Sequence, residues 1–344
     1  MRETDRPARI GFGPVTDANS FEQSGRKVAR ELESFHGFEC GFFSWNPFRL
    51  DELQEFDALV FIKYLPELRT MRALGDAGKV MLLDYQDTFL CPSVYEDATW
   101  RRMLKHVRYY PWERRDLKRF SLLDGCLVCS PLLEKVVRRA GTEPVHLPRQ
   151  IYNDANEGSF KQASDAVDGV TLYWTGVWLN QPQNDPVLPV LRRLHDNHGC
   201  RILYDTDRVG EHDWIEYRMF DNDTWAEDIL DADIAFRWRD TSNLQRFKDA
   251  NKVQGYMAAG LPAVVCPTHS ERAVIRHGET GFFAETVDEF EEIMLRLVKD
   301  PQLRSRVGTA AHEHVWRHSS LKVHVEHIRD CLHRLLAERK GVTP

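Results

Sequence analysis

The chain has 344 residues, a length that fits two domains of ordinary size. Hydrophobic residues make up 42% and charged residues 29%, a balance that provides for a packed core and excludes global disorder. The net charge of −7 argues against a polycationic protein that binds nucleic acid. No apolar run reaches the ~20 residues that a membrane-spanning helix needs. The N-terminal segment lacks the apolar region of a secretory signal and the seven cysteines form no regular framework, so we expect a cytoplasmic protein with reduced thiols.

Short apolar strands alternate with amphipathic helices through residues 1–152. The predicted strands lie at about 9–12, 38–43, 58–62, 80–83, 126–129 and 144–147. Helices are predicted at 25–34, over a long polar stretch at 96–120, and after Ser130, which caps a helix that Pro131 opens. This alternation is typical of a parallel sheet with helices on both faces, so we predict a first Rossmann-like domain over 1–152.

Residues 153–168 are polar and aperiodic, and we predict that they link two domains. The alternation restarts in a second domain, 169–320, with strands at about 170–174, 201–204, 234–236 and 263–266. Three helices near 288–299, 301–316 and 320–338 close the chain. The predicted fold is therefore α/β, with two doubly wound domains and a ligand cleft between the carboxyl ends of their sheets.

The segment 251–265, NKVQGYMAAGLPAVV, predicts a helix that ends at Gly260 and precedes a buried strand. Its first turn carries Asn251 and Lys252, which bring backbone N–H groups, the positive end of a helix dipole and an ammonium group to one point. That combination suits a diphosphate. Gln254, further along, could hydrogen-bond a ribose hydroxyl. A solvated helix start with a tight stop would give the same spacing.

The segment 225–328 carries a longer pattern. Its members are Lys252, Tyr256-Met257-Ala258, Gly260, Pro262, Glu271, Gly278-Glu279-Thr280-Gly281 and Asp300-Pro301-Gln302-Leu303-Arg304. In these residues the segment resembles the donor-binding half of GT-B glycosyltransferases of the retaining, family-4 type. The N-terminal half is similar more weakly, through 83–87, 124–130 and 144–148. The resemblance implies a nucleotide-sugar donor on the second domain, an acceptor on the first, and a C-terminal helix within 321–344 that crosses back to the first domain.

Two features depart from the pattern of that family. The family carries two glutamates eight positions apart, where this chain has Arg246 and Gln254. The family also places cations in the loop after the first strand of the donor domain, whereas the loop 175–184 has none. The missing charge could come from four cations around a lengthened loop at 237–250. The predicted donor-binding residues are therefore Arg237, Arg239, Lys248, Asn251, Lys252, Gln254, Glu271 and Gly176.

Several carboxylates have two interpretations. Glu271 would contact the donor, or would close a capping box with Thr268, or both. Asp84 and Asp87 follow a strand end, where one could orient an acceptor hydroxyl or act as a base; an Asx turn is the alternative. In a retaining reaction the leaving phosphate itself takes the acceptor proton, and otherwise Asp87 or Asp17 is the predicted base.

Charge that develops on the leaving phosphate would be stabilised by Lys252, Arg239 and helix-terminal N–H groups. We count Lys252 as catalytic, together with Asp87 and Asp17. Acidic pairs such as Asp205 and Asp207 have the D-x-D spacing of metal sites in another glycosyltransferase fold. They lie in a half that otherwise resembles a donor domain, so we expect no metal ion and no cofactor besides the nucleotide sugar as co-substrate.

The stretch 100–119 holds eight Arg or Lys residues, two acids and four large aromatic residues. Such a stretch can bind anionic headgroups or phosphates, or it can be a solvated helix face whose aromatic side chains pack inward. The predicted acceptor-binding residues are Asp84, Arg101, Arg102, Tyr109 and Trp112. We expect an anionic or lipid-linked acceptor and peripheral contact with the inner face of a membrane through 100–119, and no nucleic acid.

Together these features predict a metal-independent glycosyltransferase that moves a sugar from a nucleotide-sugar donor to an acceptor hydroxyl, in glycan, glycolipid or cell-surface polysaccharide biosynthesis. Two alternatives stay open. One is a GT-B-like nucleotide-sugar-binding subunit without turnover, suggested by the missing glutamates and loop cations. The other is a nucleotide-sugar isomerase or phosphorylase on the same fold.

Overall fold

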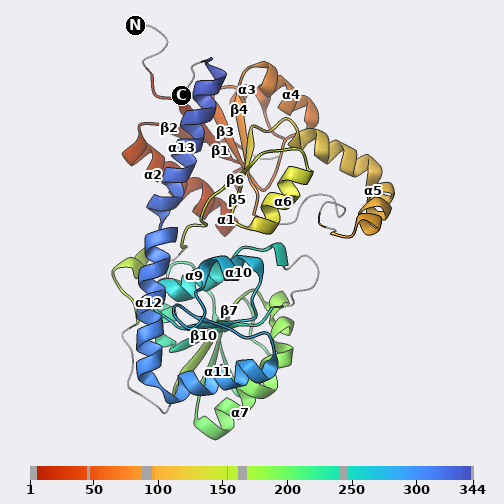
Figure 1. Cartoon of the computed structure of the whole chain (residues 1–344). Helices are drawn as coiled ribbons and strands as arrows, with labels where there is room; N and C mark the ends of the chain where they lie inside the picture. Colours follow the sequence, from red (N-terminus) through yellow and green to blue (C-terminus); the bar gives the residue numbers. More distant parts are fainter. Residues whose placement is uncertain are drawn as a thin grey trace. The chain divides into compact units, whose positions relative to one another are not determined.

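Two six-stranded parallel sheets organise the chain. The computed structural model describes residues 6–44, 47–86, 95, 97–152, 154–161, 169–239 and 246–341. These residues form two units: the first runs to Pro148 and resumes at Leu321, and the second runs from Arg149 to Ser320. The predicted α/β class with two doubly wound domains is confirmed, since helices flank a parallel sheet in each unit (Figure 1).

The sheet of the first unit has the order β2-β1-β3-β4-β5-β6, and every pair of neighbours is parallel. Its strands are β1 (Arg9–Gly13), β2 (Glu39–Phe42), β3 (Ala58–Ile62), β4 (Val80–Asp84), β5 (Gly125–Val128) and β6 (Pro144–His146). The central strands β3 and β4 are buried at every position. Strands covered on both faces are continuous apolar runs, which is why the sequence predicts these strands well.

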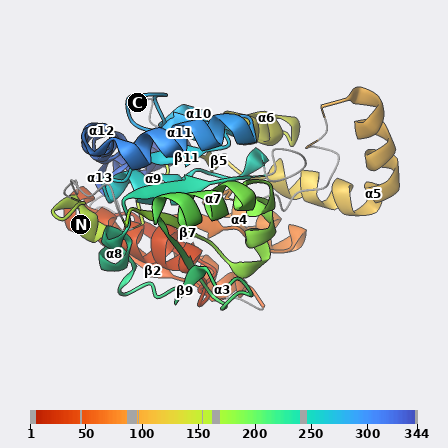
Figure 2. The same ribbon diagram turned by 90° about the horizontal axis from the view of Figure 1, so that it is seen from below.

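The helices of the first unit follow the strands in alternation. They are α1 (Asn19–Phe21), the π-helical turn η1 (Glu22–Lys27), α2 (Val28–His36), α3 (Leu50–Leu53), α4 (Leu68–Asp76), α5 (Thr99–Phe120) and α6 (Pro131–Arg139). The predicted cap of α6 is confirmed, because the Ser130 hydroxyl accepts a hydrogen bond from the amide of Leu132 at 3.3 Å. Helix α5 projects from this unit and bends along its length, with Pro111 inside it (Figure 2).

The C-terminal helix α13 (Leu321–Arg339) belongs to the first unit. It lies beside α2, and its Val325, Ile328 and Leu332 are buried in the same core as Ile10 of β1 and Val28 of α2. The end of the chain that follows the second sheet is therefore an integral part of the first unit's core.

The sheet of the second unit has the order β12-β11-β10-β7-β8-β9. Its strands are β7 (Thr171–Thr175), β8 (Arg201–Thr206), β9 (Ile215–Met219), β10 (Ile234–Arg237), β11 (Ala263–Val265) and β12 (Phe282–Phe283). The edge strands β9 and β12 are absent from the sequence prediction. β9 has a single buried residue and carries charged residues, and β12 has two residues, so neither gives an apolar run.

The helical segments of the second unit cover both faces of its sheet. They are η3 (Asp154–Glu157), η4 (Trp178–Val187), α7 (Leu188–His198), α8 (Trp225–Asp228), η5 (Ile229–Asp231), α9 (Asn251–Ala258), α10 (His269–Val274), α11 (Val287–Lys299) and α12 (Pro301–Ser319). The three predicted closing helices correspond to α11, α12 and α13.

The predicted linker at 153–168 differs from what the structure shows in the part it describes, 154–161. Asn156 is buried, and its amide nitrogen donates to the carbonyl oxygens of Ser159 at 3.0 Å and Ala226 at 2.8 Å. The ring of Phe160 stacks on His312 with centroids 4.2 Å apart. This polar segment is therefore packed onto the second unit, and the units divide after Pro148 and after Ser320.

Within the described ranges, we find no helix with both the length and the apolar character needed to cross a membrane.

Candidate functional site

The strand order of the second sheet reverses between β7 and β10. From β7 the chain builds β8 and β9 on one side, and it then returns to build β10, β11 and β12 on the other. In open α/β sheets, ligands bind outside the carboxyl ends of the strands at such a switch point. Here the two strands end at Thr175 and Arg237.

Four cationic side chains gather at this switch point, and we call them the cation cluster: Arg237, Arg239, Lys248 and Lys252. Arg237 ends β10 and Lys252 lies in the first turn of α9. The ammonium group of Lys252 donates to the carbonyl oxygen of Thr175, at the end of β7, over 3.1 Å. The sequence predicts that these four residues replace the cations missing from the loop 175–184, and the structure brings them together.

Gly176 makes room for Lys252. A Cβ atom at this position would lie 3.0 Å from the Lys252 ammonium nitrogen and 2.6 Å from the ring of Trp174. Any side chain would therefore displace the ammonium group or the ring. The backbone amide of Gly176 donates to the carbonyl oxygen of Asp205 at 3.1 Å, which fixes the turn after β7 beside β8.

Within the described residues, the charges that act on Lys252 are mainly positive. Burial, reinforced by Arg237, Arg239 and Lys248, holds the pKa of Lys252 well below its usual range. Burial, reinforced by Arg239, lowers the pKa of Arg237 to about 10. The Nη1 atom of Arg237 is buried and has no hydrogen-bond partner among the described residues. A buried guanidinium nitrogen without a hydrogen bond and like charges at close range are both costly, so a bound anion would be favoured here.

Glu271 is one counter-charge of the cluster. It is fully buried, and its Oε2 atom accepts the backbone amide of Thr268 at 2.9 Å in a capping box, so the predicted cap is confirmed. Its Oε1 atom lies 3.4 Å from Nη2 of Arg239, which is itself buried. Glu271 thus helps to hold the guanidinium group of Arg239 in place. A direct contact between Glu271 and a donor stays a prediction.

Gln254 lies in the interior of the second unit. Its side chain is 2% exposed, and its amide nitrogen donates to the carbonyl oxygen of Arg149 at 2.9 Å and the hydroxyl of Ser319 at 3.0 Å. This placement does not favour the predicted contact with a ribose hydroxyl, because both amide protons are used inside the unit. Gln254 instead joins the segment that enters the second unit to the end of α12.

The first turn of α9 also carries Asn251, as predicted. Its Oδ1 atom accepts the backbone amide of Lys252 at 2.7 Å, and Ala250, at the N-cap position, contributes no side-chain acceptor. The helix N-terminus therefore points its dipole toward the same place as the cation cluster, which adds to its preference for an anion.

Asp205 and Asp207 have different surroundings despite their D-x-D spacing. Asp205 is buried, accepts a hydrogen bond from the hydroxyl of Tyr173 at 2.8 Å, and burial raises its pKa to about 6. Asp207 is exposed and accepts the backbone amide of Trp178 at 2.6 Å, an interaction that lowers its pKa. Of the residues that the structure describes, no three His, Cys, Asp or Glu side chains form a group suited to a metal ion.

The predicted carboxylates of the first unit lie near the ends of its strands. Asp84 ends β4, is 3% exposed and accepts a hydrogen bond from the amide of Gln86 at 2.6 Å. The same amide donates to the hydroxyl of Ser24 at 2.7 Å. Asp17 is exposed in the segment after β1. Asp87 lies outside the described residues.

The predicted acceptor-binding residues of the basic stretch all lie on α5. Arg101 stands over the ring of Trp100 at 5.1 Å, and Tyr109 packs edge-on against Trp112 at 6.1 Å. Trp112 is exposed, and so are Trp100 and Tyr110. The alternative in which the aromatic side chains of this stretch pack inward is therefore wrong for these three residues.

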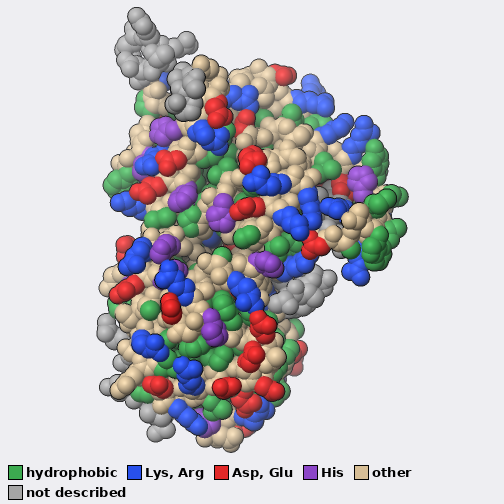
Figure 3. Space-filling model, viewed as in Figure 1, with side chains coloured by type: hydrophobic (Ala, Val, Ile, Leu, Met, Phe, Trp, Pro, Cys, Tyr) green, Lys and Arg blue, Asp and Glu red, His purple; other side chains and the backbone are tan. Residues whose placement is uncertain are grey.

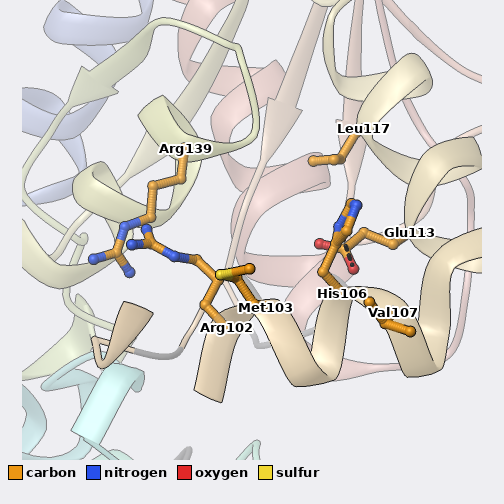
Figure 4. Close-up of a pocket in the computed structure, with 7 residues that line it drawn as sticks. All are labelled: Arg102, Met103, His106, Val107, Glu113, Leu117 and Arg139. Carbon is orange, nitrogen blue, oxygen red and sulfur yellow. Dashed lines mark ion pairs between the residues drawn. The ribbon is translucent and has the colours of Figure 1, made fainter. Parts of the chain in front are cut away.

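A pocket of about 350 Å³ opens between α5 and α6. It is lined by Arg102, Met103, His106, Val107, Glu113, Leu117 and Arg139 (Figure 4). The imidazole Nδ1 of His106 lies 3.2 Å from a carboxylate oxygen of Glu113, so this carboxylate faces an internal partner. The guanidinium groups of Arg102 and Arg139 point to the other end of the pocket.

The two sheets and the helices around them define the chain as a GT-B fold, the architecture of many glycosyltransferases. Among solved structures it is similar to sucrose-phosphate synthase from Thermosynechococcus elongatus, with 12% identity and a TM-score of 0.65 over 97% of this chain and 100% of the other. It is similar to a glycosyltransferase from Rickettsia africae, with 11% identity and a TM-score of 0.65 over 98% and 100%.

HepE from Anabaena, in complex with UDP, matches with 12% identity and a TM-score of 0.64 over 94% of this chain and 99% of the other. No protein-family model matches the sequence, and no curated protein matches it either.

Proposed function

We propose that this protein is a glycosyltransferase that transfers a sugar from a nucleoside-diphosphate sugar to an acceptor hydroxyl. The observation that carries the proposal is the partly buried cation cluster at the switch point of the second sheet. Lys252 and Arg237 converge there with the N-terminus of α9, and the pKa values of both side chains are lowered by burial and by neighbouring cations. A diphosphate is the anion that this combination suits best.

The similar structures support the nucleotide part of the proposal. HepE has been solved with UDP and with UDP-glucose, so a chain of this fold accommodates a uridine nucleotide sugar. The position of the cluster, at the carboxyl ends of β7 and β10, is the place where doubly wound sheets bind ligands. We infer a nucleotide sugar as donor for this chain from these two lines together.

The cluster also supplies a reason for metal-independent transfer. When the bond between the sugar and the diphosphate breaks, negative charge grows on the leaving phosphate. Lys252, Arg237 and the helix N-terminus are fixed before the reaction and would stabilise that charge, which is a large term in catalysis. Glu271 would hold Arg239 in place for the same purpose.

We further propose the retaining course of the family-4 type. In that course the leaving phosphate takes the acceptor proton, so the cation cluster must hold the phosphate close to the reacting carbon. Asp84 of the first unit remains a candidate for orienting the acceptor, and Asp17 remains a candidate base for a reaction that does not retain configuration. The acceptor is proposed to be anionic or lipid-linked, because all exposed charges on α5 are positive.

The test is incubation of the full chain with a panel of nucleoside-diphosphate sugars, with and without EDTA. A transferase slowly releases nucleoside diphosphate by hydrolysis, a binding subunit shows a thermal shift without release, and an isomerase changes the sugar while the diphosphate bond stays intact. We expect release that EDTA does not reduce, and a hydrolysed sugar whose first-formed anomer retains the donor configuration.

Lys252→Ala and Lys299→Ala form a matched pair for this assay, because Lys299 is an exposed lysine at the end of α11. We expect release to fall in the first variant and to stay at the parent level in the second. Absence of both release and thermal shift with every donor would contradict the proposal.

A further inference from the structure

Five large hydrophobic side chains are exposed on the first half of α5. They are Trp100, Met103, Leu104, Val107 and Tyr110, with exposed fractions between 46% and 76%. Their spacings of three and four residues place them on one face of a helix that turns about 100° per residue. We call this face the apolar stripe. Isolated exposed hydrophobic residues need no explanation, but a continuous stripe indicates a surface that binds something.

The exposed charge on α5 has one sign. The helix carries eight cations: Arg101, Arg102, Lys105, Arg108, Arg114, Arg115, Lys118 and Arg119. Its two acids, Glu113 and Asp116, are both buried, and they pair with His106 and Arg119. Every exposed charge on α5 itself is therefore positive; the exposed Asp97, just before the helix, pairs with Lys135 and Arg139 of α6.

The shape of the first unit makes the stripe accessible. Helix α5 projects from the unit in both views of the ribbon, and hydrophobic side chains gather at its outer end beside Lys and Arg side chains (Figures 1, 2 and 3). Met103 and Val107 belong both to the stripe and to the pocket between α5 and α6. The pocket also holds the guanidinium groups of Arg102 and Arg139, so apolar and cationic surface continue from the stripe into a hollow of about 350 Å³ (Figure 4).

We propose that α5 binds the surface of an anionic lipid bilayer, with the apolar stripe inserted among the acyl chains next to the headgroups. A helix with an apolar face, cationic flanks and a tryptophan and a tyrosine at the boundary is suited to lie in the interface plane. The flanking cations attract anionic headgroups, and the Arg102 end of the pocket takes a lipid phosphate.

The charges on α5 argue against two other occupants. A second copy of this chain, paired stripe to stripe, would bring the cationic flanks of both helices together at a cost in free energy. Nucleic acid would satisfy the cations but would leave the apolar stripe without a partner. A bilayer satisfies both features at once.

This inference extends the proposed function by naming the surface at which an anionic or lipid-linked acceptor would be met. Its test needs no activity. The full chain is sedimented with vesicles of phosphatidylcholine alone and with vesicles that also contain phosphatidylglycerol, at physiological ionic strength. We expect sedimentation with the anionic vesicles only, and a decrease as salt rises.

Two double variants separate the apolar and the electrostatic contributions. Leu104→Asp with Val107→Asp places charge in the stripe and should lower partitioning at least ~tenfold. Lys105→Gln with Arg108→Gln should lower binding to the anionic vesicles about thirtyfold, at ~1 kcal/mol per cation. The control is Phe35→Asp, an exposed hydrophobic residue of α2 outside α5, which should bind like the parent.

The five substituted residues are all at least partly exposed, and a circular-dichroism melt checks that each variant folds. The proposal is overturned if the parent does not bind anionic vesicles, or if the Leu104/Val107 variant binds them as the parent does. It is equally overturned if sedimentation velocity shows a dimer of the parent that this variant lacks, because the stripe then covers a second copy. Loss of vesicle binding without loss of nucleotide-sugar turnover leaves the proposed reaction intact.

Discussion

Both sheets of this chain reverse their strand order, the first between β1 and β3 and the second between β7 and β10, but the side chains at the carboxyl ends of their strands differ in charge. In the second unit, Lys252 and Arg237 lie at the ends of β7 and β10, close to two further cations, Arg239 and Lys248. In the first unit, the amide of Gln86 ties Asp84, at the end of β4, to the hydroxyl of Ser24. The same type of sheet thus carries cations at one set of strand ends, where we propose that an anion binds, and Asp84 with Gln86 at the other, where we propose that an acceptor hydroxyl binds.

The largest effect is expected when the ammonium group of Lys252 is removed from the cation cluster. Lys252→Ala should weaken binding of a nucleoside diphosphate by ~1.5–3 kcal/mol, the range for hydrogen bonds to charged groups, while binding of the bare nucleoside stays the same. Calorimetry with UDP and with uridine measures both. Equal losses for the two ligands would mean that Lys252 does not face the diphosphate.

The first unit supplies the control for this comparison. Asp84→Asn keeps an oxygen for the amide of Gln86, and it should leave the affinity for nucleoside diphosphate within about twofold of the parent. A loss as large as that of Lys252→Ala would show that the strand ends of the two sheets do not divide the ligands as we propose.

A smaller effect is expected at Gln254, and on stability. Gln254→Ala leaves the buried carbonyl of Arg149 and the hydroxyl of Ser319 without their donor, so the free energy of unfolding should fall by ~1–3 kcal/mol. The Michaelis constant for the donor should change little if the protein is assayed below its melting temperature. If the denaturation midpoint is unchanged and the Michaelis constant for the donor is raised, Gln254 binds the ribose as the sequence predicts.

The smallest expected effect is on the pH dependence of stability and comes from Asp205. Burial raises the pKa of Asp205 to about 6, so the folded protein holds this proton more tightly than the unfolded chain does. The ionised carboxylate therefore costs stability above about pH 6, and the cost disappears below about pH 4. Asp205→Asn keeps an acceptor for the Tyr173 hydroxyl and should stabilise the protein by ~1–2 kcal/mol at pH 8, with no gain at pH 4. Urea denaturation at the two pH values measures the difference; a gain that is independent of pH would refute this origin.

Much of the fold follows from the sequence because parallel strands covered on both faces are apolar runs, as in β3, β4 and β7. The edge strands β9 and β12 lack that signal. The predicted linker shows the opposite error: a polar composition predicts a solvent-exposed segment, whereas Asn156 is polar and buried because its amide has backbone partners. Composition does not reveal which polar groups are satisfied inside.

The residues of the candidate site likewise differ in how well the sequence predicts them. The cation cluster could be predicted, since cations close in sequence flank one strand end and one helix start. The orientation of Gln254 could not be read from its chemistry, although its helical spacing from the buried Met257 and Ala258 was a usable signal. The exposed apolar stripe on α5 could not be predicted either, because the sequence does not show whether a neighbouring helix covers that face.

Proton uptake on nucleotide binding tests the central claim most directly. Burial and neighbouring cations hold the pKa of Lys252 well below its usual range in the free protein, and a bound diphosphate must raise it again. Between these two pKa values, binding takes up a proton, so the affinity should fall as pH rises, by at most about tenfold per pH unit.

Calorimetric titration with UDP in two buffers of different ionisation enthalpy measures that proton. We predict uptake of up to one proton by the parent and by Lys299→Ala, and none by Lys252→Ala. If UDP binds tightly with the same apparent enthalpy in both buffers across the pH range, or if Lys252→Ala takes up the proton as the parent does, the diphosphate does not bind at the cation cluster as proposed.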